Sequence, residues 1–146
     1  MKLELTLPDI VGYLPYGLYC WYGENIKAAL MVGITDYQIP IFEVGRKPIL
    51  RPISDLRVEI TERGYNDGKP FVPVKRLGEL LGSDYEDCLI LDCRIKYSPS
   101  EVWYSDMCAF LDLLHRLHFD YRGLIDAGLA VSVHDLKQNP YEAANN

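Results

Sequence analysis

The strongest constraint on the fold is a periodic apolar pattern in SEVWYSDMCAFLDLLHRLHFD, residues 100–120. Its large apolar side chains recur at alternating intervals of four and three positions. The residues of this series are Trp103, Met107, Phe110, Leu114 and Leu117. Because an α-helix completes a turn in about 3.6 residues, this spacing aligns them on one face of a helix about five turns long. We therefore expect a long C-terminal amphipathic helix whose apolar face packs on the rest of the chain.

Short apolar segments in the first third of the chain indicate strands. LYCWYG (18–23) is aromatic and apolar and ends in glycine, and QIPIFEVG (38–45) suits an edge strand because Pro40 lacks an N–H. IKAALMVGI (26–34) fits either a buried strand or a helix. These segments predict an α+β fold, in which a small antiparallel sheet from the N-terminal half packs against the long C-terminal amphipathic helix and shorter helices.

The stretch KPILRPISDL (47–56) contains two prolines, each of which disfavours helical angles in the residue before it, Lys47 and Arg51. Residues 47–52 should therefore be extended. Two alternatives remain for the next segment of the chain: Ser54 caps the start of a helix, or LRVEIT continues as a strand through its alternating apolar residues. In both cases the stretch favours an architectural role over an active site.

Turn and helix signals organise the remaining segments. The Asn-Asp-Gly sequence at 66–68 tolerates the positive φ angles of tight turns. Short helical segments are expected at 8–11, where Pro15 ends the helix, and at 74–82. The C-terminal QNPYEAANN is polar and should fray. We therefore expect a single α+β domain over residues 1–138, followed by a polar tail over 139–146.

Composition limits the class of protein. The chain has 146 residues, a formal net charge of −6 and 49% hydrophobic residues, as in an ordinary globular domain that forms a core without metals or disulfides. The acidic balance disfavours a protein that mainly grips nucleic-acid phosphates. The four cysteines have no C-x-x-C spacing, which favours free thiols. With no apolar run of transmembrane length and no signal-peptide pattern, we expect a cytoplasmic protein without a membrane partner.

Tyrosines and a tryptophan near the N-terminus supply most of the candidate binding residues. Such side chains offer a large, rigid contact area with a polar tip. In a strand, Tyr19 and Trp21 face away from Tyr22, so one part of the group faces the core. Three interpretations stay open: a core wall, a protein interface, or a platform on which bases stack. The candidate binding residues are Tyr16, Tyr19, Trp21, Tyr22, Lys47 and Arg51, the last two sharing one side of an extended run.

A weak metal-site pattern lies on the expected helix. Asp112, His115 and His118 are spaced three residues apart, which places neighbours on adjacent turns, as metal ligands on a helix often are. The pattern is not the HExxH zinc signature, and the ordinary interpretation is one partly buried and one exposed histidine. The sequence also lacks a phosphate-binding loop, a dinucleotide-binding motif and a nucleophile elbow. We therefore assign no catalytic residue and no cofactor.

Four distinctive blocks carry a resemblance to a known family. They are YLPYGL (13–18), KPILRPISDL (47–56), GKPFVPV (68–74) and HFDYRGLIDAGLAVSV (118–133). Together they resemble small uncharacterised proteins encoded by bacteriophages and mobile elements of Bacteroides-like bacteria, in the order found in that family. The resemblance implies a role inside the bacterial host cell or in the virion. It implies no activity, ligand or catalytic residue.

Three hypotheses for function arise from these observations. The first is a non-enzymatic accessory protein that binds a host or phage protein, or a second copy of itself. The second is a nucleic-acid-associated regulator, which requires several basic residues to gather on one side. Those residues are Lys47, Arg51, Arg57, Lys69, Lys75 and Arg76. The third is a metal-dependent enzyme or metal-stabilised domain built around His115 and His118.

Overall fold

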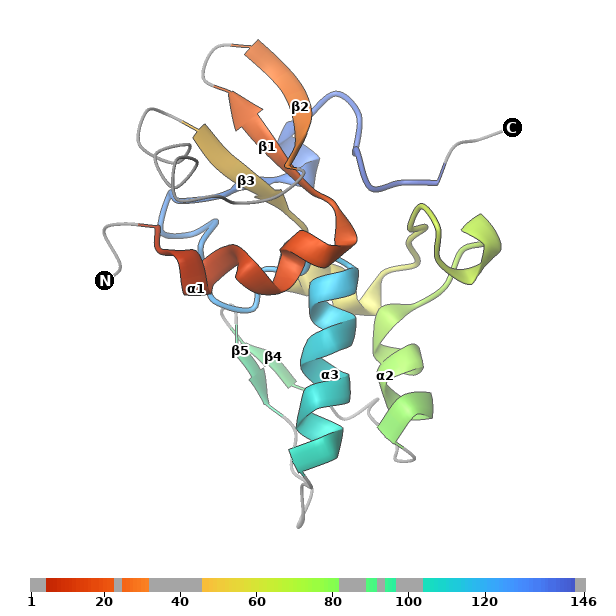
Figure 1. Ribbon diagram of the computed structural model, residues 1–146. Helices are drawn as coiled ribbons and strands as arrows, with labels where there is room; N and C mark the ends of the chain where they lie inside the picture. Colours follow the sequence, from red (N-terminus) through yellow and green to blue (C-terminus); the bar gives the residue numbers. More distant parts are fainter. Residues whose placement is uncertain are drawn as a thin grey trace.

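The computed structural model describes residues 5–22, 25–31, 46–81, 89–91, 94–96 and 104–143. Figure 1 shows a small sheet in the upper part of the molecule and two helices side by side below it, α2 (Pro73–Leu81) and α3 (Tyr104–Arg116). The N-terminal helical segment crosses between the sheet and the end of α3. Within the described ranges, no helix has the length and apolar character needed to cross a membrane.

Four strands of the described residues form one sheet, in the order β2-β1-β3-β6. They are β1 (Leu18–Tyr22), β2 (Asn25–Met31), β3 (Arg46–Leu50) and β6 (Val131–Ser132). β1 is antiparallel to β2 and β3, whereas β6 runs parallel to β3. The expectation of an antiparallel sheet from the N-terminal half is therefore wrong. The sheet is mixed because a long crossover returns the C-terminal part of the chain to pair with β3.

The expected long C-terminal helix is also wrong. α3 has 13 residues, between three and four turns, and the chain continues through further described structure after it. The apolar series did locate its buried face, since Phe110 and Leu114 are in the core. The helix ends early because His118 adopts a left-handed conformation, with φ of 61°, that turns the chain towards β3. The arrangement is still α+β, with a shorter helix and a different sheet.

The chain enters the fold through two consecutive helical segments. α1 (Leu7–Ile10) is followed directly by the 3₁₀ helix η1 (Val11–Tyr16), which contains Pro15. The prediction of a helical turn here is confirmed, but Pro15 does not end it. Gly17 does so instead, because its positive φ of 74° lets the chain reverse into β1.

The stretch KPILRPISDL is extended first, as predicted, and of the two alternatives left open for the next segment, a short helix forms. β3 covers its first half, and the 3₁₀ helix η3 (Ile53–Arg57) follows. Ser54 is exposed inside η3 and caps nothing, because Pro52 occupies the position before the helix. Of the alternative strand, only an isolated bridge between Ile60 and Phe71 forms. The stretch is thus architectural, but the proline rather than the serine sets where the helix begins.

Other local predictions have mixed outcomes. The Asn-Asp-Gly turn is confirmed as the 3₁₀ helix η4 (Asn66–Gly68), all three residues of which have positive φ. The helix at 74–82 is confirmed as α2, and the ambiguous segment at 26–34 contains a strand, β2. The expected strand at 38–45 lies outside the described residues. Two further short strands, β4 (Leu89–Leu91) and β5 (Arg94–Lys96), form an antiparallel hairpin.

Buried residues cover both faces of β1. One face carries Leu18 and Cys20, which pack with the N-terminal helical segment. The other carries Tyr19 and Trp21, which pack on a cluster formed by β3 and the C-terminal segment around Tyr141. Tyr141 is 2% exposed, although it belongs to the segment expected to fray. Because its side chain fills this second face, the C-terminal segment is held against the sheet from the 3₁₀ helix η6 (Val133–Asp135) onward.

Candidate functional site

The candidate site begins where β3 ends, at Arg51. The Arg51 amide donates to the His118 carbonyl at 2.7 Å, and the Asp120 amide donates back to the Arg51 carbonyl at 2.8 Å. These bonds place the segment after α3 directly beside the end of β3. A residue from the proline-rich stretch and a residue from the end of α3 therefore meet in the interior.

The side chain of Arg51 is buried, with 1% of the residue exposed. Its Nε donates to the Leu117 carbonyl at 3.0 Å, and its Nη2 donates to the Thr61 carbonyl at 3.0 Å. Nη2 also lies 3.2 Å from Oε1 of Glu62, whose side chain is 5% exposed. A buried cation is costly unless it is paired and hydrogen-bonded, and here Glu62 and the two carbonyls meet that requirement.

His118 supplies the third member of this group from the end of α3. Its amide donates to the His115 carbonyl, and the Phe119 amide donates to the Leu114 carbonyl, which together form a Schellman helix ending. Glycine is the usual residue at the left-handed position of this motif. His118 occupies it at a cost of about 1–2 kcal/mol, which implies that its buried side chain is needed there.

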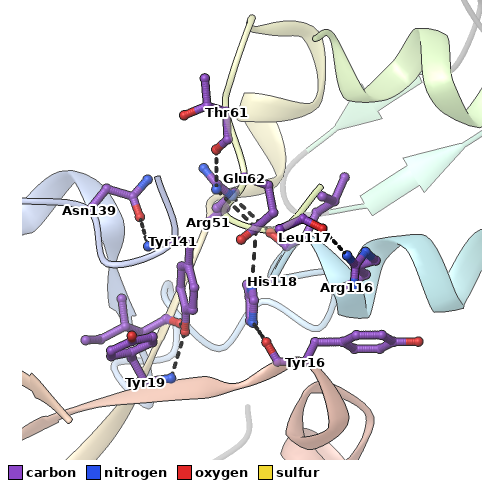
Figure 2. A network of polar contacts seen from close by, with 12 residues as sticks. Tyr16, Tyr19, Arg51, Thr61, Glu62, Arg116, Leu117, His118, Asn139 and Tyr141 are labelled. Carbon is purple, nitrogen blue, oxygen red and sulfur yellow. Dashed lines mark hydrogen bonds and ion pairs between the residues drawn. The ribbon is translucent and has the colours of Figure 1, made fainter. Parts of the chain in front are cut away.

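Both ring nitrogens of His118 have polar partners. Nε2 lies 3.2 Å from the Tyr16 carbonyl, and Nδ1 lies 3.3 Å from the same Glu62 oxygen that binds Arg51. A carbonyl only accepts, so Nε2 carries a proton. The ring stacks on Tyr141 with centroids 3.7 Å apart and planes 11° apart. Figure 2 shows these four residues converging from separate segments, and we call Arg51, Glu62, His118 and Tyr141 the buried network.

Tyr141 ties the buried network to the sheet. Its hydroxyl donates to the Ile49 carbonyl at 2.6 Å and accepts from the Tyr19 amide at 3.0 Å. Burial is the main cause that raises the pKa of Tyr141 well above its ordinary value, so the hydroxyl keeps its proton. The hydroxyl therefore bridges β1 and β3 at the point where β3 leaves the sheet.

A second group of residues lies outside the buried network, on the surface. The guanidinium carbon of Arg116 lies over two tyrosine rings, 5.6 Å from the centre of Tyr16 and 5.3 Å from the centre of Tyr65. Its Nη2 donates to the Gly64 carbonyl at 2.7 Å, and Figure 2 shows the Tyr16 ring beside it. Arg63, the residue before Gly64, places its Nη1 3.5 Å from the Tyr19 hydroxyl. We call Tyr16, Tyr65 and Arg116 the Tyr–Arg surface.

The buried network supports the Tyr–Arg surface from beneath. Tyr16 presents its ring to the surface while its carbonyl accepts from His118. Tyr65 forms a bridge with Glu62, and its amide donates to the Glu62 carbonyl at 3.1 Å. Arg116 immediately precedes Leu117, whose carbonyl accepts from Arg51. The backbone at Tyr16, at Tyr65 and at the residue after Arg116 is therefore hydrogen-bonded to residues of the buried network.

The sequence-predicted aromatic residues have different environments. Tyr16 and Tyr19 are half-buried; Tyr16 belongs to the Tyr–Arg surface, and the Tyr19 hydroxyl lies near Arg63. Trp21 is half-buried and packs on the cluster of Ile49 and Tyr141. The side chain of Tyr22 lies outside the described part of the structure. Tyr19 and Trp21 pack on the same cluster, and the expected opposite orientation of Tyr22 falls outside the described residues.

The predicted pair Lys47 and Arg51 does not act together at the surface. Lys47 lies on β3 opposite Trp21 and is half-buried. Arg51 is on the same side by strand alternation, but it lies beyond the end of β3 and is enclosed by Glu62 and neighbouring carbonyls. Its burial gives it a structural role within the chain.

The weak metal candidates are not brought together. Both nitrogens of His118 are occupied within the buried network, whereas Nε2 of His115 lies 2.7 Å from the Tyr121 hydroxyl. Asp112 is exposed. In the described ranges of the chain, no three His, Cys, Asp or Glu side chains are arranged to hold a metal ion.

His115 has a structural role against η1. Its ring meets Tyr13 edge-on at 5.0 Å, and a Cβ on Gly12 would lie 2.4 Å from the ring, so glycine permits this close approach. The Tyr13 hydroxyl donates to the Phe119 carbonyl. Burial lowers the pKa of His115 from its ordinary 6.5, with Arg122 adding to the decrease and Asp112 opposing it. The neutral imidazole is therefore the form that fits the fold.

This pKa shift predicts an acid-dependent loss of stability. The unfolded chain takes up the His115 proton at a higher pH than the folded chain does. The contribution of neutral His115 to the free energy of unfolding is therefore present above pH 6.5 and is lost as pH falls below it. We expect His115→Gln, which keeps a polar partner for Tyr121, to lose less unfolding free energy than the wild type between neutral pH and pH ~5. Urea unfolding at both pH values measures this. Equal losses in the two proteins would contradict it.

Sequence reasoning missed Glu62, Tyr65, Arg116 and Tyr141. Each is an ordinary polar or aromatic residue in its own segment, and none belongs to a motif. One weak signal was present: Tyr141 is the only aromatic residue of the polar tail, which is unusual for a segment that frays.

Comparisons with protein-family models, with curated proteins and with solved structures found no match to this chain.

Proposed function

We propose that this protein is a non-enzymatic accessory protein of a phage or mobile element and that it binds another protein through the Tyr–Arg surface. The observation that carries the proposal is the position of Arg116 between the rings of Tyr16 and Tyr65. Tyrosine and arginine are the residue types that dominate binding hot spots. An arginine that is already held loses less side-chain entropy when a partner binds. The phage context rests on the sequence resemblance alone.

A protein partner is better supported than a nucleic acid. The faces of Tyr16 and Tyr65 nearest to Arg116 are already covered by it, so bases have fewer open rings on which to stack. Of the basic residues considered for phosphate contacts, Arg51 is buried and Arg76 pairs with Glu79 at 3.0 Å. The net charge of −6 also opposes approach to a polyanion.

The proposal is tested by cross-linking and affinity capture from cells in which the gene is naturally expressed. We expect the wild-type chain to retain a stoichiometric protein partner. Arg116→Ala should reduce retention by at least about tenfold, because loss of a hot-spot arginine typically costs about 2 kcal/mol or more of binding free energy.

The matched control is Lys137→Ala, which removes an exposed cation outside the Tyr–Arg surface. It should retain the partner as the wild type does, and both variants should remain folded by circular dichroism at the temperature of the assay. Equal retention by Arg116→Ala and the wild type would reject the Tyr–Arg surface as the binding site. Recovery of nucleic acid in place of a protein would favour the regulator hypothesis.

A further inference from the structure

Resting on the proposed function, we infer that residues 139–143 act as a tethered peptide ligand of the chain's own body and that their docking holds the Tyr–Arg surface in its binding form. We call this segment the C-terminal clasp. The residues that receive it come from separate parts of the chain and are Tyr19, Ile49, Thr61, Arg63 and His118. Figure 2 shows Tyr141 reaching from the clasp to the strand that carries Tyr19.

The clasp contains a turn of its own. Oδ1 of Asn139 accepts from the Tyr141 amide at 2.9 Å, which closes an Asx turn around Pro140. This bond lies within the clasp and does not depend on the body of the protein. Lys137 and Gln138, which connect the clasp to η6, are exposed. The clasp is therefore a preorganised peptide motif on an exposed linker, and such a segment can open without unfolding the rest of the chain.

One enclosed side chain and a few main-chain bonds fasten the clasp. Tyr141 is 2% exposed, and its hydroxyl already bridges β1 and β3. Its carbonyl accepts from the Arg63 amide at 2.8 Å, and the Ala143 amide donates to Oγ1 of Thr61 at 3.0 Å. Proteins that recognise peptides combine main-chain hydrogen bonds with a buried side chain in the same way. The ligand class is therefore a short peptide with tyrosine after Asn-Pro.

The clasp is connected to the Tyr–Arg surface through His118. The Tyr141 ring covers the imidazole, with centroids 3.7 Å apart. The same imidazole donates through Nε2 to the Tyr16 carbonyl at 3.2 Å and lies 3.3 Å from Glu62. When the ring leaves, water reaches these hydrogen bonds and competes for them. Tyr16 then loses the contact that holds its backbone.

A second connection runs through the backbone at residues 63 and 64. The Arg63 amide donates to the Tyr141 carbonyl. The next residue, Gly64, has a positive φ of 75°, and its carbonyl accepts from Nη2 of Arg116 at 2.7 Å. The docked clasp therefore fixes the chain directly before the carbonyl that orients Arg116. Undocking removes supports from both a tyrosine and the arginine of the Tyr–Arg surface.

The test adds a peptide in trans to the full chain carrying Tyr141→Ala, in which the ring is missing from the site. The peptide is QNPYEA, the sequence of residues 138–143, and QNPAEA is its control. NMR should show saturable shifts of the Tyr19 and Arg63 amides with QNPYEA, and the Nε–H signal of Arg116 should return to its wild-type position. QNPAEA should bind at least about tenfold more weakly, because it lacks the ring.

Two further proteins serve as controls. The wild type should bind QNPYEA at least about tenfold more weakly than Tyr141→Ala does, because its own clasp competes at an effective concentration in the millimolar range. Leu124→Ala removes a buried side chain from the cluster on the other face of β1. It should leave the Arg116 signal in its wild-type position although it destabilises the fold, because the clasp stays docked.

Hydrogen exchange provides a measurement that does not require Tyr141→Ala to fold. In the wild type, the amides of Arg63, Tyr65 and Ala143 should open together and more readily than the amide of Leu114 within α3, because undocking is a smaller event than unfolding. Tyr141→Phe should speed exchange of these three amides by about tenfold or more. Exchange of all four amides only through global unfolding would overturn the inference.

The remaining outcomes separate the inference from the proposed function. Failure of QNPYEA to bind folded Tyr141→Ala, equal binding of QNPAEA, or an equal movement of the Arg116 signal in Leu124→Ala would each count against the clasp. If the Arg116 signal ignores the peptide while Arg116→Ala still loses its captured partner, the inference falls and the proposed function stands. If QNPYEA restores the signal while Arg116→Ala keeps its partner, the peptide site stands and the proposed function falls.

Discussion

Replacing Glu62 by alanine is expected to lower the free energy of unfolding by about 3–5 kcal/mol, because it leaves the Arg51 cation buried without its counter-charge. The Glu62 carboxylate lies 3.2 Å from Arg51 and 3.3 Å from His118, and all three side chains are at least 95% buried. Water cannot replace the lost oxygen at this depth without opening the structure. Urea unfolding followed by circular dichroism measures the change.

Two variants show whether the effect is due to the buried charge. Glu59→Ala removes an exposed carboxylate from the same segment and should change stability by less than about 0.5 kcal/mol. The double variant Arg51→Met, Glu62→Leu should lose less than the sum of its single changes, because neither charge is left alone. A loss below about 1 kcal/mol for Glu62→Ala would mean that the pair is not closed in solution.

Replacing Tyr141 by alanine should lower the free energy of unfolding by a similar amount, about 3–5 kcal/mol, as expected for deleting a buried aromatic ring. The ring fills the space between Tyr19 and His118, with which it makes an edge contact and a stack. Tyr141→Phe keeps the ring but leaves the Ile49 carbonyl and the Tyr19 amide without the hydroxyl, at a cost of about 1–3 kcal/mol. Urea unfolding of the two variants beside the wild type measures both changes.

The neighbouring residue provides the control for this prediction. Glu142 is exposed, so Glu142→Ala should unfold with the wild-type free energy. A chain ending at residue 138 should be at least as unstable as Tyr141→Ala, since it lacks the same ring. If the shortened chain were as stable as the wild type, the C-terminal segment would be the dispensable tail that its polar composition suggests.

Local features of the fold were predictable where the signal lies within one segment. The apolar series around Phe110 and Leu114 located α3, and the prolines at 48 and 52 located the extended run that becomes β3. The length of α3 was not predictable, because the pattern continues through Leu117 while the helix stops one residue earlier. It stops because His118 is drawn inward, towards Glu62 and Tyr141, which are remote in sequence.

The candidate site was predictable only in part. The tyrosines near the N-terminus were recognised as contact residues from their type, and one of them, Tyr16, belongs to the Tyr–Arg surface. Arg51 was noticed because the prolines left it unexplained, but its burial depends on Glu62, eleven positions further along. Arg116 gave no signal at all, since a basic residue near the end of a helix is an ordinary feature.

By itself, the sequence determined where chain segments extend, turn or coil, because backbone preferences at proline, glycine and alternating apolar residues act over a few neighbours. The tertiary structure decided which strand completes the sheet and which polar side chains are buried. It also decided that Arg51 is enclosed beside Glu62 while Arg116 lies over two tyrosine rings. Those outcomes depend on residues separated by tens of positions, such as Tyr16 and His118, which meet only after the whole chain has packed.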